Sequence, residues 1–367
     1  MPSRSRHALI VALALSLAGC AGGAVNPAST APSEPAPTAR PSVSAPSPSA
    51  PTATATTAPS PSPAAVVGPG EAWIAMQAES AAGYGVHFVR SDGTGLHRWA
   101  AEIPGTQEHP DWSPDGQRVL VNAVSAASLE DIWIADADGT NAERVVECVE
   151  PCRWADEPSW SPDGASIVFQ RLVVGDAGKA ISTLERLDVA SGSIDVLLTM
   201  PPQHVILAPR YAPDGSSLTV EVIHLPTDSW IAEPDGGAIG IVDLAAPKPE
   251  VEYLTEFTSW ANNPDWSPLD DVIVYCQFSD ASAETSDLYA IAPDGTDRRQ
   301  LTDVAAGGGQ AYQPTITPDG SRVLFVLYDP ASGADGMASI AIDGTDLRPA
   351  TGDTYVGGTH PRLRPAP

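Results

Sequence analysis

The sequence predicts an all-β fold, a six-bladed β-propeller whose blades are four-stranded antiparallel sheets. Two observations predict it. One short motif recurs at intervals of about fifty residues, and β-rich runs separated by turn residues follow the copies. In addition, the segments at the two ends of the repeat region are complementary fragments of one repeat. We expect the ring to close by pairing of the C-terminal strand with the N-terminal strands, which leaves no open sheet edge.

The motif reads Pro-Asp-Trp-Ser-Pro-Asp-Gly in its first copy. The fourth copy departs from this pattern at Leu269-Asp270, and the sixth is cut short by the C-terminus. The intervals between successive leading prolines are 48, 51, 55, 50 and 47 residues, so each copy indicates one structural unit. The copies begin at Pro110, Pro158, Pro209, Pro264, Pro314 and Pro361.

Each unit is predicted to contain four short strands. The motif supplies the first strand and a turn, because Asp-Gly between two apolar runs favours a hairpin. In the first unit, residues 119–121 are the predicted second strand and residues 131–134 the third. A second turn at Asp138-Gly139 then leads to a short fourth strand.

The two ends of the repeat region complete each other. Residues 72–76, 85–89 and 96–99 are predicted as second, third and fourth strands that lack a first strand. Residues 360–364 are predicted as a first strand without the rest of its blade. Joined together, the two segments form the sixth blade, and one domain then covers residues 71–367.

The repeated Trp-Ser-Pro-Asp-Gly core resembles the TolB-like, WD-repeat-like propeller family, and the resemblance covers essentially all of the predicted domain. It implies the same six-bladed fold. TolB proper carries a small α/β domain before its propeller, whereas a spacer is predicted there in this sequence. Serine peptidases with propellers have a similar repeat, but the Gly-x-Ser-x-Gly elbow of their hydrolase domain is missing from this sequence.

The N-terminus is predicted to be a lipoprotein signal peptide covering residues 1–20. Arg4 and Arg6 precede an apolar run from Ala8 to Ala18, and the segment ends in Leu-Ala-Gly-Cys20, which looks like a bacterial lipobox. We therefore expect Cys20 to be lipidated, with an ordinary cleaved signal peptide as the alternative. Residues 21–70 are rich in Pro, Ala, Ser and Thr and are predicted to be a disordered linker.

The charge of the chain limits its partners. It contains 46 acidic and 19 basic residues, for a net charge of −27. Nucleic acid is excluded by this balance, because phosphates require Lys and Arg. The same balance excludes docking of the folded domain on anionic lipids, so the lipid anchor is the expected membrane contact.

Three cysteines follow Cys20. Cys148 and Cys152 flank Pro151 in a predicted loop, and outside the cytoplasm a disulfide between them is the default expectation. A metal pair is the alternative, although no second pair of Cys or His has a matching spacing. Cys276 lies in an apolar run and is expected to be a buried thiol.

The position just before each motif proline is predicted to face the central channel. Because first strands line that channel, these residues should form one ring at its mouth, as a site for a ligand or metal. Two imidazoles, an amide and a carboxylate in this ring are candidate ligands of a divalent metal, namely His109, His360, Gln313 and Glu157. A solvated polar mouth without metal is the alternative. The ring positions are His109, Glu157, Ala208, Asn263, Gln313 and His360.

Two other features have simpler structural interpretations. The motif aromatics could stack on a ligand, but a large residue at one place in successive units is best explained by packing between sheets. The sequence Asp136-x-Asp138-Gly139 could bind calcium, but turn chemistry explains it without the missing remainder of a calcium loop. The motif aromatics are Trp112, Trp160, Tyr211 and Trp266.

These features favour a non-catalytic binding scaffold, a monomeric extracytoplasmic propeller anchored to the cell envelope, with a protein or envelope glycan as its ligand. No catalytic residue and no certain cofactor are predicted. One alternative is a metal-dependent enzyme acting on polysaccharides, because oligogalacturonate lyase, a relative of the family, has a His-rich metal site in its propeller channel. Such an enzyme would need an arginine for uronate carboxylates, for which Arg153 and Arg210 are the candidates. The other alternative is a calcium-stabilised structural spacer.

Overall fold

The computed structural model describes residues 71–80, 83–99 and 102–366. The predicted signal peptide, Cys20 and the predicted linker lie outside these residues. Within the described ranges, no helix is long and apolar enough to cross a membrane. The all-β prediction is confirmed, because the described residues form antiparallel strands with three short 3₁₀ turns.

The strands follow one another in sets of four, with the motif in the first strand of each set. The first strands are β4 (Thr106–Trp112), β8 (Cys152–Trp160), β12 (His204–Tyr211), β16 (Ala261–Trp266), β20 (Gln310–Ile316) and β24 (Thr359–Leu363). The second strands are β1 (Trp73–Ser80), β5 (Arg118–Val124), β9 (Ser166–Val174), β13 (Ser217–His224), β17 (Ile273–Phe278) and β21 (Arg322–Asp329).

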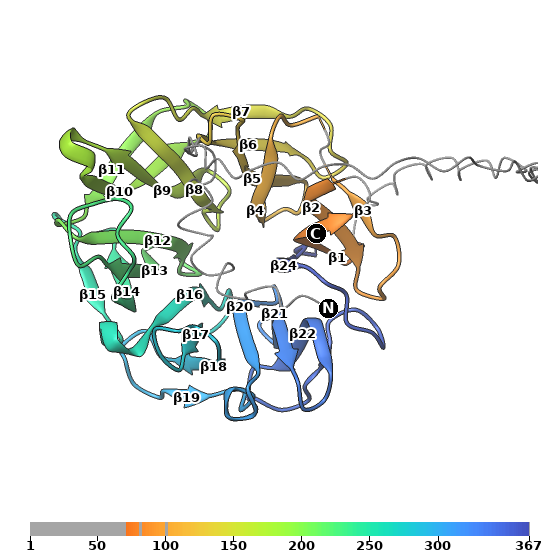
Figure 1. Ribbon diagram of the computed structural model, residues 1–367. Coiled ribbons are helices and arrows are strands. Elements are labelled where there is room, and N and C mark those ends of the chain that lie inside the picture. The colour runs from red at the N-terminus through yellow and green to blue at the C-terminus, as the bar shows by residue number, and fades with distance from the viewer. Residues whose placement is uncertain (1–70, 81–82, 100–101, 367) are drawn as a thin grey trace, which may run out of the picture. The chain divides into compact units, whose positions relative to one another are not determined.

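The third and fourth strands lie further from the middle (Figure 1). The third strands are β2 (Gly83–Arg90), β6 (Glu130–Asp136), β10 (Ala180–Asp188), β14 (Gly236–Asp243), β18 (Ser286–Ile291) and β22 (Ala334–Ala341). The fourth strands are β3 (His97–Arg98), β7 (Glu143–Val146), β11 (Ile194–Thr199), β15 (Val251–Tyr253), β19 (Arg299–Gln300) and β23 (Arg348–Pro349). The 3₁₀ turns are η1 (Asp176–Gly178), η2 (Phe257–Ser259) and η3 (Ala305–Gly307).

Pairing within each set is antiparallel, in the order first, second, third and fourth strand. Single parallel pairings also join two sets to their successors, through Glu130 and Trp154 in one case and Ser286 and Gln310 in the other. The described strands therefore form two four-stranded and two eight-stranded sheets, where the sequence predicted six separate ones. The difference arises because the third strands β6 and β18 each pair, through one residue, with the first strand of the following set, β8 and β20.

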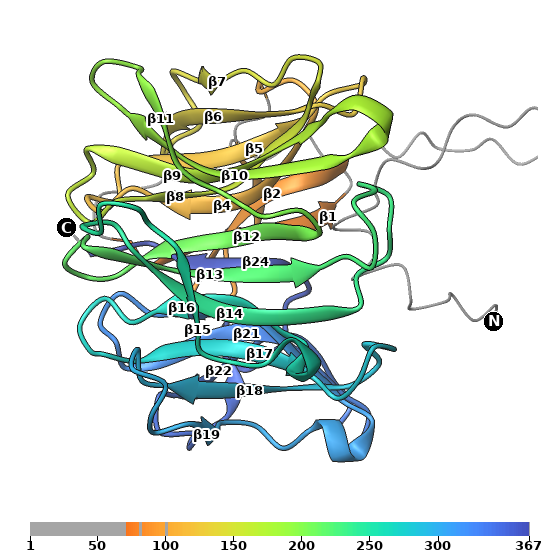
Figure 2. The ribbon, with the colours of Figure 1, turned by 90° about the vertical axis from the view of Figure 1, so that its left-hand side faces the viewer.

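The C-terminal strand β24 pairs antiparallel with β1, with Ile74 opposite Leu363 and Gln77 opposite Thr359. Figure 1 shows β4, β8, β12, β16, β20 and β24 nearest the middle of the arrangement. The view from the side in Figure 2 shows β12, β13 and β14 next to one another in one sheet. The first strands therefore lie nearest the centre.

The motif turn has the expected chemistry. In the first copy, Gly116 donates its N–H to the carbonyl of Ser113, and the Ser113 hydroxyl donates to Asp115 at 2.6 Å. Gly116 has a φ of +63°, and a Cβ added there would lie 3.0 Å from the carbonyl oxygen of Pro365. Glycine is required here by both the backbone conformation and the close approach of the chain just after β24.

The motif tryptophans are buried between neighbouring sets, as their spacing indicates. Trp112 packs with Phe88 of β2, with ring centroids 4.9 Å apart, and donates its indole N–H to the carbonyl of Arg362. Trp160 belongs to a cluster with Leu120 of the preceding set, and Trp266 to a cluster with Ile239 of the set before its own. These side chains stabilise the stacking of the sheets and lie away from the central surface.

Candidate functional site

The six residues that precede the motif prolines share one backbone conformation. Each has a positive φ, between 46° and 53°. In β4, β8, β12, β16 and β20 the pairing register with the second strand shifts at this residue. The register between β24 and β1 shifts as well, between Ala75 and Gln77 of β1. These are β-bulges, which turn one backbone amide out of the sheet and re-aim a side chain toward the centre.

Side chains from neighbouring sets bind several of the turned-out amides. Glu157 accepts the N–H of Ala208 at 2.5 Å, and Glu221 of β13 accepts the N–H of Asn263 at 2.9 Å. The side-chain oxygen of Gln313 accepts the N–H of His360 at 3.2 Å. The predicted ring is therefore a buried hydrogen-bonded seam between sets, and only Asn263 in it is more than slightly exposed.

His109 is held by a carboxylate from the next set. Its Nδ1 lies 2.7 Å from Asp156 Oδ1 and 3.1 Å from Asn122 Oδ1. Burial disfavours the imidazolium, but the charge of Asp156 and its hydrogen bond outweigh this and raise the pKa of His109 to about 9. At neutral pH His109 is therefore a buried cation paired with Asp156.

His360 has the opposite protonation state. Its pKa is lowered well below the ordinary value by burial, followed by the positive charge of His109. The Gln313 amide lies 2.9 Å from Nε2 of His360 and donates to it, which places the proton of the neutral ring on Nδ1. The two histidine rings meet edge to face, with centroids 4.4 Å apart. One charged and one neutral imidazole thus form an edge-to-face pair.

The predicted metal site stays a prediction. A proton on Nδ1 of His109, directed at Asp156, leaves Nε2 as the ring nitrogen that can offer a lone pair, and this Nε2 has no hydrogen-bond partner within the described residues. One oxygen of Glu157 is taken by the Ala208 amide. No group of three or more His, Cys, Asp or Glu side chains in the described ranges is arranged to hold a metal ion.

Below the histidines, the centre narrows to a cavity of about 10 Å³. It is lined by five of the six ring residues, by the buried Arg210 and by the partly exposed Arg362. Arg210 Nε lies 3.9 Å from Asp265 Oδ1, and Arg362 Nε lies 3.7 Å from Asp111 Oδ1. The positive charges of Arg210 and Arg362 therefore lie near the negative charges of Asp265 and Asp111. Arg210 is part of the structure of the centre and is not a free site for an anion.

On the other side of the ring residues a much larger cavity opens, with a volume of about 430 Å³. It lies over four of the six first strands, from β8 to β20. Loop residues 230–234 and 281–283 complete its wall. The aromatic side chains in its lining are Trp154, Trp230, Trp260, Phe278 and Tyr312.

Carboxylates from the ring and its neighbours also line the large cavity. Burial and then the charge of Glu157 raise the pKa of Glu221 to about 8, against the opposing effect of the Asn263 amide. Burial and the charge of Asp156 also raise the pKa of Glu157, although His109 opposes this. Both groups would be stabilised in their charged form by a cation in the cavity.

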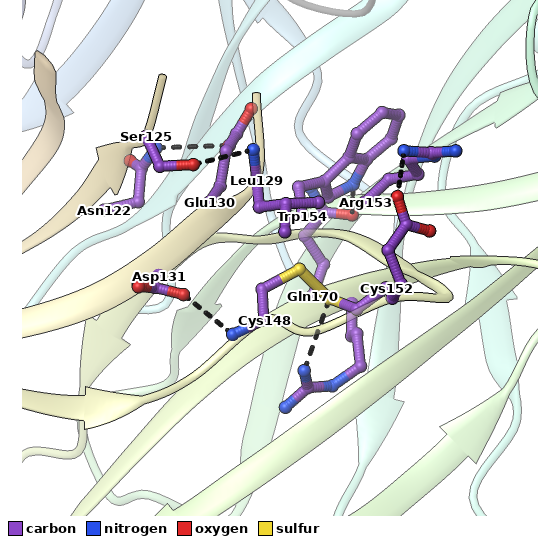
Figure 3. Close-up of a disulfide and its surroundings, with 12 residues drawn as sticks. Asn122, Ser125, Leu129, Glu130, Asp131, Cys148, Cys152, Arg153, Trp154 and Gln170 are labelled. Carbon is purple, nitrogen blue, oxygen red and sulfur yellow. Dashed lines mark hydrogen bonds and ion pairs between the residues drawn. A yellow bond between two sulfur atoms is a disulfide. The ribbon is translucent and has the colours of Figure 1, made fainter. Parts of the chain in front are cut away.

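The disulfide region positions one wall of this cavity (Figure 3). Cys148 Sγ and Cys152 Sγ are bonded at 2.03 Å, at the beginning of β8. Two residues further on, Trp154 donates its indole N–H to Gln170 at 2.9 Å. The neighbouring Arg153 lies over the ring of Trp230, 5.4 Å from its centroid, and so connects β8 to the opposite loop. Cys276 is buried and is not in a disulfide within the described residues.

The turn at Asp136-x-Asp138-Gly139, for which turn chemistry was favoured over calcium binding, is satisfied by its own residues. Asp138 Oδ1 accepts both the backbone N–H and the hydroxyl of Thr140, and these hydrogen bonds lower the pKa of Asp138. The corresponding turns at Asp92, Asp294 and Asp343 have the same arrangement. Turn chemistry therefore accounts for these aspartates.

A family model described as the TolB β-propeller domain matches residues 72–305, which is more than half of the chain. The chain belongs to this family. The TolB-like resemblance read from the repeated motif is thereby confirmed.

Three relatives of this TolB-like propeller illustrate its distance from known proteins. A putative TolB from Agrobacterium tumefaciens is 20% identical over 76% of this chain and 87% of its own, with a TM-score of 0.51. TolB from Acinetobacter baumannii is 16% identical over 80% of this chain and 67% of its own, with a TM-score of 0.59. An uncharacterised protein of Agrobacterium fabrum is 26% identical over 113 residues, 30% of this chain and 38% of that relative. At these identities the solved structures show the fold alone.

The large cavity of this TolB-like propeller was missed by sequence reasoning. The cavity is lined by three of the ring residues, Glu157, Asn263 and Gln313, and by the residues one place earlier in four of the first strands. These positions carried a usable signal, since Asp156, Asn262 and Tyr312 precede Glu157, Asn263 and Gln313. Nothing in the repeat indicated Glu221, which lies on a second strand.

Proposed function

We propose that this chain is a lipid-anchored extracytoplasmic propeller of six blades that acts as a non-catalytic, monomeric binding scaffold for a protein or glycan of the cell envelope. The observation that carries the proposal is the one-sided cavity of about 430 Å³ over the first strands β8, β12, β16 and β20. Sites of this size and aromatic character are typical of ligand binding.

The strand pairing supports the six-bladed ring. Six sets of four strands are present, and β24 both pairs with β1 and contacts β4 and β20 on either side. A ring joined in this way leaves only the outer fourth strands as edges. Four of these, β3, β15, β19 and β23, are two or three residues long, which disfavours edge-to-edge association and supports a monomer.

The anchor and the location rest on separate features. The lipobox at Cys20 and the Pro-rich segment after it are those of a tethered lipoprotein. The Cys148–Cys152 disulfide fits an oxidising compartment. The acidic body, at a net charge of −27, would not bind an anionic membrane without such an anchor.

The experiment uses the full-length chain, immobilised and exposed separately to glycan and protein fractions of the envelope. We expect one fraction to be captured intact. Trp230→Leu should abolish capture, whereas Tyr253→Leu, which removes an exposed aromatic from β15 outside the cavity, should leave it unchanged. Cleavage of the captured glycan, or equal capture by the two variants, would contradict the proposal.

A further inference from the structure

The large cavity has aromatic walls on several sides. Trp154 comes from β8, Trp230 from the loop before β14, and Trp260 and Tyr312 from the beginnings of β16 and β20. Phe278 closes the wall at the end of β17. Aromatic faces carry partial negative charge, and several of them around one cavity attract a cation more strongly than a single ring does.

The charged part of the lining is acidic. Asp156, Glu157, Glu221 and Glu233 line the cavity, and no Lys, Arg or His side chain of the described residues does so. Asp156 is already paired with His109, at 2.7 Å. No salt bridge to Glu157 or Glu221 is formed within the described part of the chain.

Glu157 and Glu221 are each more than nine-tenths buried. Each accepts one backbone N–H through Oε2, from Ala208 and from Asn263. The Oε1 atoms of both have no hydrogen-bond partner among the described residues, and both side chains face the cavity. Neither Oε1 atom is among the fully buried side-chain atoms that lack a partner, so both oxygens are accessible from the cavity. A cation in the cavity would therefore meet them directly and stabilise the charged form of both groups.

We propose that the cavity binds an organic ammonium group, with the aromatic walls around its alkyl substituents and the charge of Glu221 and Glu157 beneath it. This inference rests on the proposed binding function and specifies the ligand chemistry. A neutral sugar could donate hydroxyl hydrogen bonds to these carboxyl groups but would bring no positive charge against them. A bare divalent metal would require several converging oxygen ligands, for which the aromatic walls provide no substitute. The ammonium belongs either to a free small amine or to a lysine side chain of an envelope protein.

The test titrates the full-length chain with choline chloride, and separately with its neutral isostere 3,3-dimethylbutan-1-ol, at constant ionic strength. Trp154, Trp230 and Trp260 report binding through their fluorescence. Choline should saturate the signal, and the isostere should bind at least about tenfold more weakly. A parallel titration with a short lysine peptide and its acetyl-lysine form distinguishes a protein-borne ammonium from a free one.

Variants assign the binding to the cavity. Glu221→Gln should weaken ammonium binding by about tenfold or more, and Trp230→Leu by about fivefold. The matched control Glu252→Gln removes an equal charge from the exposed part of β15 in the same set and should leave the affinity unchanged. Circular dichroism melting verifies that each variant is folded.

Saturable binding of choline or of the lysine peptide, lost in Glu221→Gln, supports the proposal and identifies the source. Equal binding of choline and its isostere, equal effects of Glu221→Gln and Glu252→Gln, or no binding of either ammonium ligand would overturn it. If the ammonium ligands fail while the same preparation still captures its envelope fraction, the ligand class is wrong and the binding function stands.

Discussion

Glu221 makes the stability of the unliganded protein depend on pH in a way that can be calculated. Its carboxyl is 7% exposed, and burial followed by the charge of Glu157 raises its pKa from 4.5 to about 8. In the unfolded chain the group ionises near its ordinary value. Between these two values the native state holds a proton that the unfolded state has lost, so stability falls as the pH rises.

The magnitude follows from the shift. One pKa unit corresponds to about 1.4 kcal/mol, so the loss attributable to Glu221 reaches roughly 4 to 5 kcal/mol once the pH exceeds 8. In Glu221→Gln the side chain is neutral at every pH, and its amide oxygen can still accept the Asn263 N–H. The variant should therefore match the wild type near pH 4 and become increasingly more stable than it up to pH 9.

The assay is urea unfolding of the full-length wild type, Glu221→Gln and the exposed control Glu252→Gln at several pH values between 4.5 and 9. Groups common to all three proteins cancel in the differences. The wild type and Glu252→Gln should give parallel curves, and Glu221→Gln should diverge from both above pH 5. A constant difference between Glu221→Gln and wild type across this range would refute the electrostatic account of the cavity.

Three further predictions concern the centre and the ring. Asp156→Asn should lower the pKa of His109 from about 9 toward its ordinary value, because the Asp156 carboxylate, 2.7 Å from Nδ1, stabilises the imidazolium. Nuclear magnetic resonance of the imidazole protons measures this pKa, and an unchanged value would contradict the prediction. Gly116→Ala should destabilise the fold by about 1 to 3 kcal/mol, because the φ of Gly116 is positive and the new Cβ would crowd Pro365. Thermal melting measures this loss, with Gly307→Ala as the control, since an added Cβ there meets nothing within 4 Å. Removal of residues 359–367 should expose the edge of β1 and cause association at micromolar concentration, seen by light scattering, whereas a monomer of unchanged stability would refute the pairing of β24 with β1.

The repeat made most of the strand order predictable. Because the motif combines a proline, a large aromatic and an Asp-Gly turn at a regular period, it locates the first strand, the hairpin and the packing of Trp112 in one step. The complementary ends predicted the pairing that the structure shows between β24 and β1. These features depend on local propensity and burial, which the sequence contains directly.

The site was only partly predictable, because it depends on backbone geometry and loop length. The ring positions were located, but a single sequence did not indicate that His109 and Glu157 adopt positive φ at β-bulges. It predicted a polar mouth, and the bulges instead bury these side chains in hydrogen bonds between sets. The large cavity depends on loop residues 230–234 and 281–283, whose lengths differ from unit to unit and follow no repeat.

The central claim is that Glu221 provides negative charge to an ammonium ligand. The titratable side chains around it are Asp156, Glu157 and Glu233 in the cavity lining and the buried thiol of Cys276, while His109 acts through Asp156. At pH 7 the Glu221 carboxyl, with its pKa of about 8, is mostly protonated in the empty cavity. A bound cation favours its ionised form, so binding must release a proton.

The most direct measurement is calorimetric titration of the full-length chain with choline at pH 7, in two buffers of different ionisation enthalpy. We expect the wild type and Glu252→Gln to release protons on binding and to bind more tightly as the pH rises through 8. Glu221→Gln should release far fewer protons, with Glu157 as the remaining source. Binding without proton release by the wild type, or equal release by Glu221→Gln, would contradict the central claim.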